Sequence, residues 1–223
     1  MSFIAGIVNI TGVLSISTLT TNVTGHFAYF AEELVSLRYS NALFFLMFIL
    51  FFLLGAFASS FLVELVSRIR PSISHAVPMA IEVLILCAIA LLGHGFVQTI
   101  AGHYMVACAL LFSMGIQNSL VTHISQATVR TTHLTGLFTD LGIELSQLFF
   151  YRQPSQIRKL SKSINLRLVI IIFFFTGCIL GGFLFNMLEL KTLFLAAGLL
   201  ITALFYDTLR YRFYFYQRKV SRR

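Results

Sequence analysis

An eight-residue phrase occurs twice in this chain, and it constrains the fold more than any other feature. Residues 20–27 read TTNVTGHF, and residues 131–138 read TTHLTGLF. A Gly-Ile-x-Asn element precedes each phrase, at residues 6–9 and 115–118, and a Glu-Leu pair follows each at the same offset. A match of this length indicates an internal duplication.

The composition places this duplication in a membrane. Hydrophobic residues make up 58% of the chain, charged residues only 11%, and the mean hydropathy is +0.89. A globule of 25.1 kDa with so few polar residues could not cover its surface in water. The three cysteines are isolated in apolar runs and lack metal-ligand spacing, so we expect neither a metal nor a cofactor.

Apolar runs long enough to span a bilayer define the elements. A span needs about 20 residues, and we predict helices at 41–66, 76–96, 104–122, 168–188 and 192–206. Two segments, 3–37 and 104–150, are too long for one straight helix, and each contains the Thr-rich phrase in its middle. We therefore expect the first and fourth spanning helices to be interrupted at the Thr-Gly motifs.

The basic residues predict the topology, because Lys and Arg in short loops stay on the cytoplasmic side. If each interrupted segment crosses once, most of the 16 basic residues fall on one side: Arg68, Arg70, Arg152, Arg158, Lys159, Lys162, Arg167, Arg210, Arg212, Arg218, Lys219, Arg222 and Arg223. Only Arg38 and Lys191 fall on the other side, and Arg130 lies within an interrupted segment. We expect six crossings with both termini cytoplasmic, and no nucleic-acid partner.

Three crossings per copy require the second copy to insert with the opposite orientation. We therefore predict an all-α membrane protein, a single transmembrane domain of residues 1–223 built as a 3+3 inverted repeat. Repeat 1 covers about 1–100, repeat 2 about 101–211, and residues 212–223 form a short basic cytoplasmic tail. Residues 54–57 and 180–183 (LGAF and LGGF) are a weaker echo of the duplication. Glycines there favour close helix packing within the chain or, through Gly55 or Gly181, in a homodimer.

The interrupted phrases have the chemistry of a ligand site. Inverted-repeat transporters bind substrate near the midplane, between discontinuous helices, and a half-helix N-terminus favours an anionic group. The candidate substrate-binding residues are Asn9, Thr20, Thr21, Thr24, Gly25, His26, Asn118, Arg130, Thr131, Thr132, His133, Thr135 and Gly136. The alternative is that both breaks are structural kinks, in which Thr hydroxyls bond to backbone carbonyls and Gly serves tight packing.

Acidic residues within apolar segments are candidates for ion coupling, because ionisable groups at membrane depth are costly. Asp140 and Glu144 share one face of a predicted half-helix, and Glu33 is the counterpart of Glu144. An interfacial, non-coupling position remains open for all three. Glu82 would bind a proton or, as we favour, snorkel toward a basic loop together with Glu64.

These features resemble the YoaK family of bacterial membrane proteins of unknown function. The resemblance rests on the Gly-x-x-Asn element and the Thr-Gly helix start in both halves, most specifically on residues 115–118. It implies a six-span protein of the bacterial inner membrane, suspected of being a transporter. The family usually has Asp where this chain has Asn9, and Asn where it has His26, so a carboxylate mechanism at position 9 does not carry over.

Two functions follow from these patterns. The first is a secondary transporter or permease for a small solute, favouring an anionic or zwitterionic one, in contact with membrane lipids. The alternative is a non-transporting accessory or lipid-binding scaffold protein. We do not expect an enzyme, because no G-x-S-x-G element, H-E-x-x-H motif or phosphate loop is present.

Overall fold

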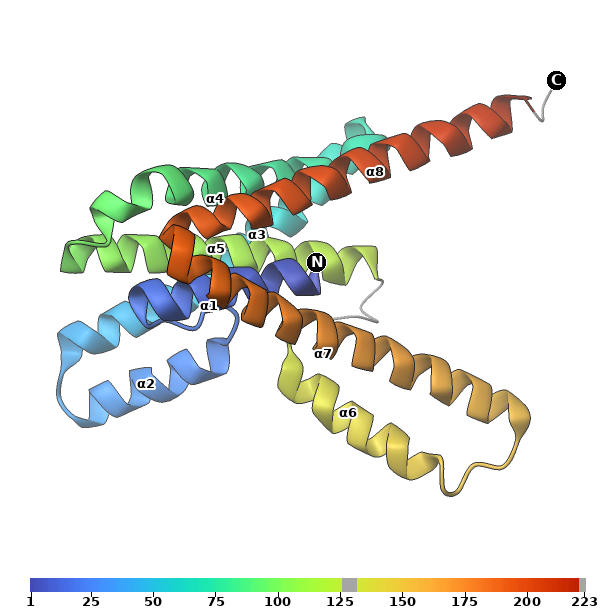
Figure 1. Ribbon diagram of the computed structural model, residues 1–223, viewed down its shortest axis with the longest axis horizontal. Coiled ribbons are helices and arrows are strands. Elements are labelled where there is room, and N and C mark those ends of the chain that lie inside the picture. Colours follow the sequence, from blue (N-terminus) through green and yellow to red (C-terminus); the bar gives the residue numbers. More distant parts are fainter. Residues whose placement is uncertain (126–131, 221–223) are drawn as a thin grey trace.

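The computed structural model describes the backbone of residues 1–125 and 132–220, and the side chains of these ranges up to Tyr206. This described part is helical, and its long helices run broadly along one axis (Figure 1). The elements in chain order are α1 (Ser2–Ile16), α2 (Val23–Val35), α3 (Tyr39–Ile69), η1 (Pro71–Ile73), α4 (Ala76–Phe96), α5 (Ile100–Ile124), α6 (Leu134–Gln147), α7 (Pro154–Leu188), η2 (Glu189–Thr192) and α8 (Leu193–Val220).

Four helical stretches in the described residues are long and apolar enough to cross a membrane, as a membrane protein requires. They are Tyr39–Ile69, Pro71–Phe96, Ile100–Ile124 and Pro154–Tyr206, and the last combines α7, η2 and the start of α8. α1 is a shorter apolar helix. The all-α prediction is confirmed, and each predicted span coincides with one of the long helices α3, α4, α5, α7 and α8.

α7 begins 14 residues before the predicted span, at Pro154 instead of residue 168. Proline suits the first turn of a helix, because a backbone N–H there has no acceptor within the helix and its loss costs nothing. The proline ring also fixes φ near its helical value. The added residues are mostly polar, so hydropathy alone did not include them. They are used to pack α7 against α6, where Leu141, Leu160 and Ile164 form a small separate apolar cluster.

The first and second halves of the chain pack into each other. α1 packs along α7, and α5 packs along α3. α1 and α5 run in opposite directions along the long axis, α2 runs toward one end of the molecule, and α6 runs toward the other (Figure 1). Each half therefore supplies its first helix to the other half.

Glycines set the closeness of these two helix pairs. A Cβ on Gly6 would collide with the backbone of Phe174 in α7, and one on Gly115 would collide with the backbone of Phe52 in α3. The partner helices use glycines at the same contacts. A Cβ on Gly177 of α7 would collide with the backbone of Phe3, and one on Gly55 of α3 would collide with that of Phe112. Without a hydrophobic drive between helices in lipid, such close approach is a main source of packing energy.

These contacts correct two details of the sequence reading. The glycine that occupies the position of Gly55 in the second half is Gly177, one helical turn before Gly181. Gly181 instead packs against Ile7 of α1. Since Gly55 and Gly181 are both buried within the chain, neither offers the dimerisation face that we had considered.

The connections sort by charge along the long axis. The α2–α3 and α7–α8 connections, which carry Arg38 and Lys191, lie toward the left of Figure 1. The α6–α7 connection and the end of α8 lie toward the right, as does the α3–α4 connection with Arg70. This order matches the predicted separation of basic residues. The N terminus, however, lies near the middle of the axis and not at the end where α8 finishes.

Candidate functional site

At the first break the chain folds back on itself. α1 ends at Ile16, and Ser17 adopts the left-handed conformation, φ 52° and ψ 31°, that commonly ends helices. The returning segment lies against Gly12, where a Cβ would meet Thr20 and the carbonyl of Thr18. The sequence predicts an interruption here, and the structure shows one in which residues 17–22 turn back along α1 before α2 runs on in the direction of α1 (Figure 1). A left-handed residue and a glycine make that reversal possible.

Asn9, in the middle of α1, holds the returning segment. Its Oδ1 accepts a hydrogen bond from the backbone N–H of Thr20 at 3.1 Å and from the hydroxyl of Thr21 at 3.0 Å. These bonds satisfy polar groups of a non-helical segment, which membrane depth demands. The repeated Asn and the repeated Thr pair are therefore partners in space.

α2 begins at Val23, directly after these contacts. Asn22 caps it by accepting from the N–H of Gly25 at 3.1 Å. His26, one turn in, is only 3% exposed, and its Nε2 lies 2.8 Å from the carbonyl of Leu19. The imidazole also contacts the rings of Phe45 and Phe48 in α3.

Two polar atoms of the first break lack partners in the described residues. They are the hydroxyl of Thr20, a residue that is 0% exposed, and Nδ1 of His26. Because the other ring nitrogen donates to a carbonyl when His26 is neutral, Nδ1 is then an acceptor without a donor. Buried polar groups are nearly always satisfied in folded proteins. These two atoms are therefore suited to a polar ligand.

The second break repeats the anchoring contact. Asn118 of α5 accepts through Oδ1 from the hydroxyl of Thr132, as Asn9 does from Thr21. α6 then begins at Leu134, so both Thr-Gly pairs lie in the first turn of a helix as predicted. Two of the predicted site residues, Arg130 and Thr131, lie outside the described residues.

In its described part, from Thr132 onward, the second break does not repeat the buried histidine of the first. Leu137 stands at the position of His26 and is buried. His133 precedes α6 without a side-chain cap bond, it is exposed, and a Cβ on Gly136 would meet its ring. Thr135 and Thr24 are also exposed. The structure thus brings Asn9, Thr20, Thr21 and His26 together, and separately Asn118 and Thr132.

The far end of each short helix is tied to the next helix by an arginine. Glu33 of α2 receives two bonds from Arg38, at 2.6 and 3.0 Å, and one from Asn41 at 3.2 Å. Glu144 of α6 receives two from Arg167 of α7, at 2.9 and 3.0 Å. The two equivalent glutamates therefore have equivalent two-pronged partners, although the arginines come from different positions.

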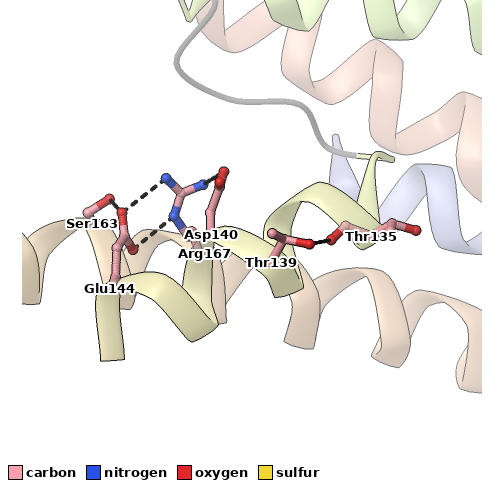
Figure 2. Close-up of polar contacts among 6 residues, drawn as sticks. All are labelled: Thr135, Thr139, Asp140, Glu144, Ser163 and Arg167. Atoms are coloured by element: carbon pink, nitrogen blue, oxygen red, sulfur yellow. Dashed lines mark hydrogen bonds and ion pairs between the residues drawn. The ribbon is translucent and has the colours of Figure 1, made fainter. Parts of the chain in front are cut away.

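The second of these clusters, drawn in Figure 2, has more members than the first. Arg167 also donates to Asp140 at 2.9 Å, and the hydroxyl of Ser163 donates to Glu144 at 2.6 Å. The Thr139 hydroxyl donates to the carbonyl of Thr135 in its own helix. The predicted coupling residues Glu33, Asp140 and Glu144 are thus members of ion pairs between helices.

Glu82 corrects an interpretation made from the sequence. We favoured snorkelling toward a basic loop, as Glu64 does beside Arg68. Glu82 is instead 0% exposed, and neither carboxylate oxygen has a hydrogen-bond partner among the described residues. Ser113 and Gln117 of α5 are likewise fully buried, each with an unpartnered oxygen. Their spacing of four residues on an apolar helix was the signal available in the sequence.

The remaining chemistry of the described residues is sparse. No three His, Cys, Asp or Glu side chains in residues 1–125 and 132–206 are grouped in a way that would hold a metal ion. An apolar cavity of about 850 Å³ lies between α3, α4 and α5, with Met47, Ile85 and Tyr104 among its lining residues. The described residues therefore suit two kinds of binding: a small polar group at a helix break, or an apolar chain in this cavity.

Comparison with known proteins identifies a family. No curated protein and no solved structure gives a significant match to the chain. One family, described as proteins of unknown function, matches residues 1–206, which is nearly all of the sequence and includes both helix breaks. The chain therefore belongs to the DUF1275 family.

Proposed function

We propose that this protein is a secondary transporter or permease for a small solute in the bacterial inner membrane, of the kind the YoaK resemblance implies. In this proposal its six crossings form a 3+3 inverted repeat, with α1–α2 and α5–α6 as the two interrupted helices and both termini cytoplasmic. Transporters of that design bind substrate beside discontinuous helices and alternate access by rocking one repeat against the other. The proposal gives the protein no enzymatic role.

The proposal is supported first by the matched contacts of the two halves. Asn9 and Asn118 anchor equivalent threonines, and Gly6 and Gly115 seat their helices on the opposite half. Two similar bodies in reciprocal contact are the arrangement that rocking motion requires. The charge separation of the connections supports the topology.

The single observation that carries the proposal is the pair of unsatisfied polar atoms at the first break, the Thr20 hydroxyl and His26 Nδ1. A ligand N–H or O–H would bond to Nδ1, and the Thr20 hydroxyl can donate or accept. The neighbouring start of α2 favours a negative group, although Asn22 already occupies the N–H of Gly25. A small zwitterion, such as an amino acid, fits both requirements.

A thermal-stability screen of the purified protein tests this site. The probes are amino acids, short carboxylates, inorganic anions and sugars, each at two pH values. A ligand at 100 times its Kd stabilises the folded state by about 2.7 kcal/mol. We expect a zwitterion to raise the Tm of the wild type but not that of Thr20→Val or His26→Phe.

Thr139→Val is the matched control, because its hydroxyl donates to a carbonyl of its own helix and the residue is exposed. It should respond to the probe as the wild type does. The stabilising compound is then tested for uptake into proteoliposomes. Equal stabilisation of the wild type, Thr20→Val and His26→Phe by every active probe would contradict the site, and absence of uptake would contradict transport.

The lipid-binding scaffold remains a second candidate because of the apolar cavity between α3, α4 and α5. Its lining is apolar, and its volume of about 850 Å³ suits a lipid acyl chain. Replacing Ala109, which lines this cavity, by Phe would partly fill it. If the protein is a lipid-binding scaffold, native mass spectrometry will show bound phospholipid in the wild type and less in Ala109→Phe. Equal lipid content would contradict this candidate.

A further inference from the structure

Glu82 lies in the seventh position of α4 and is completely removed from solvent. Both of its carboxylate oxygens lack hydrogen-bond partners, and the ion pairs of the described residues all involve other carboxylates. An ionised carboxylate in such a place has lost its hydration, and no hydrogen bond from the described residues replaces it, which makes the arrangement costly. Burial of this kind favours the neutral form of Glu82.

Gln117 and Ser113 face the same region from α5. α4 and α5 form a hairpin joined at residues 97–99, where Gly102 packs on Phe96. In antiparallel helices with that register, Glu82 lies opposite Gln117. Met1 lies near this cluster: Gln117 donates to its sulfur at 3.9 Å, and the positive charge of its amino group acts on Glu82. Three buried polar side chains with unpartnered oxygens therefore occupy one part of the core.

Few charged groups are available to this cluster. On α8 the residues from Leu193 to Tyr206 carry no charge, and the charged residues of η2, Glu189 and Lys191, lie at the other end of α4. On α3, Glu64 and Arg68 are exposed and pair with each other. On α5, His103 and His123 bond to Val97 and Ser60 near the helix ends. The Met1 amino group is a positive charge that acts on Glu82, and His75, just before α4, has an interaction of its own.

We propose that Glu82 is a proton-binding site within the helix bundle, with Gln117 and Ser113 as hydrogen-bond partners of the carboxyl group when it rotates. A proton fits better than a metal ion. Ca²⁺, for example, takes about six to eight oxygen ligands, and this cluster offers far fewer. The protonated carboxyl adds an O–H donor, which can bond to Gln117 Oε1 or Ser113 Oγ, both of which lack a donor.

This site is separate from the helix breaks and does not depend on the proposed substrate. If transport is confirmed, a buried carboxyl that binds and releases a proton is a natural coupling group, and that role alone rests on the proposed function. Proton binding by Glu82 can be tested whether or not the protein transports a solute.

Infrared spectroscopy of the purified protein in lipid nanodiscs tests the proposal. A protonated carboxyl has a carbonyl-stretch band that is resolved from ionised carboxylates and shifts in D₂O. We expect this band in the wild type at neutral pH, where an ordinary glutamate is ionised. It should be lost in Glu82→Gln and kept in Glu64→Gln, the matched control with an exposed carboxylate in α3.

Raising the pH should abolish the band in the wild type, and returning to neutral pH should restore it. If Glu82→Gln does not yield a folded protein, Glu82→Asp serves in its place and should move the band without removing it. A wild type without the band, or a band unchanged in these variants, would overturn the assignment. A band that does not respond to pH would overturn reversible binding.

Discussion

At the scale of single residues, the glycines between helices have the clearest physical role. Gly6, Gly55, Gly115 and Gly177 each face the backbone of another helix so closely that a Cβ would collide with a carbonyl group. Backbone cannot move aside as a flexible side chain can, so the helices would have to separate. Other glycines of the chain, such as Gly198, face open space.

Gly177→Ala should therefore destabilise the protein strongly, while Gly198→Ala should be neutral or slightly stabilising, because Ala favours helix. Overpacking of this kind typically costs about 1–3 kcal/mol. Thermal unfolding of the two variants in the same detergent measures the difference. Equal Tm values for both variants would show that α1 and α7 are not packed as closely as described.

Asn9 is the second residue with a specific role, because both groups that bond to its Oδ1 are donors. A carboxylate accepts as well as an amide oxygen, so Asn9→Asp should keep the first break intact. Asn9→Leu should cost about 1–3 kcal/mol, since the N–H of Thr20 would be left without a partner. Thermal unfolding and proteolysis within residues 17–22 should rank the three proteins in that order. Greater damage from Asp than from Leu would contradict the assigned bonding.

At the scale of elements, each short helix is held at both ends. Its start is anchored through an asparagine of the preceding helix, and its far end through a Glu–Arg pair to the following helix. The two pairs differ in exposure: the side chain of Arg38 is 53% exposed, and that of Arg167 is 20% exposed. Screening by solvent makes exposed pairs weak.

Double-mutant cycles should resolve this difference. We expect a coupling energy of about 1–3 kcal/mol for Glu144 and Arg167, in line with hydrogen bonds to charged groups. For Glu33 and Arg38 we expect a smaller coupling energy, because solvent screens this exposed pair. The cycles use Glu→Gln and Arg→Gln replacements, which preserve length. A larger coupling for the α2 pair would contradict the description of α6 as the more firmly held helix.

At the scale of the whole molecule, most of the basic residues that the structure describes belong to the connections and adjoining helix segments at one end of the long axis. Arg38 and Lys191 belong to the opposite end. If the helices cross a bilayer, the basic end is cytoplasmic. A homodimer remains a prediction, and its interface would have to use surfaces other than the buried Gly55 and Gly181.

Cysteine accessibility in whole cells tests this orientation. In a variant without Cys87, Cys108 and Cys178, we expect Ser36→Cys to react with a membrane-impermeant thiol reagent. Ser155→Cys should react only after the cells are opened, because it lies at the start of α7 in the basic connection. Labelling of Ser155→Cys in intact cells, with protection of Ser36→Cys, would reverse the topology.

The helical class, the long apolar helices and the two Thr-Gly helix starts were all predictable from the amino-acid pattern. Hydropathy identifies segments that can span a membrane, and capping residues and glycines act on the helix turn next to them. Both kinds of signal can therefore be recognised without knowing which helices touch. The sequence also identified the asparagines and threonines of the breaks, because the duplication repeats them. It did not reveal that residues 17–22 turn back along α1 at the first break, since the direction of a loop depends on what the loop packs against.

The charge partners and the burial of the acidic side chains became known only from the folded arrangement of the helices. Glu144 was a candidate for coupling until Arg167, 23 residues away, was found beside it. For Glu82 the neighbouring residues in the sequence allow either a buried position or one near the basic loop, and we favoured the second. The structure shows that Glu82 is buried, in a helix that packs against α5 and α8. A side chain's burial and its charge partners are set by helices distant in sequence. Local pattern gives the elements, and contacts between them give each polar group its environment.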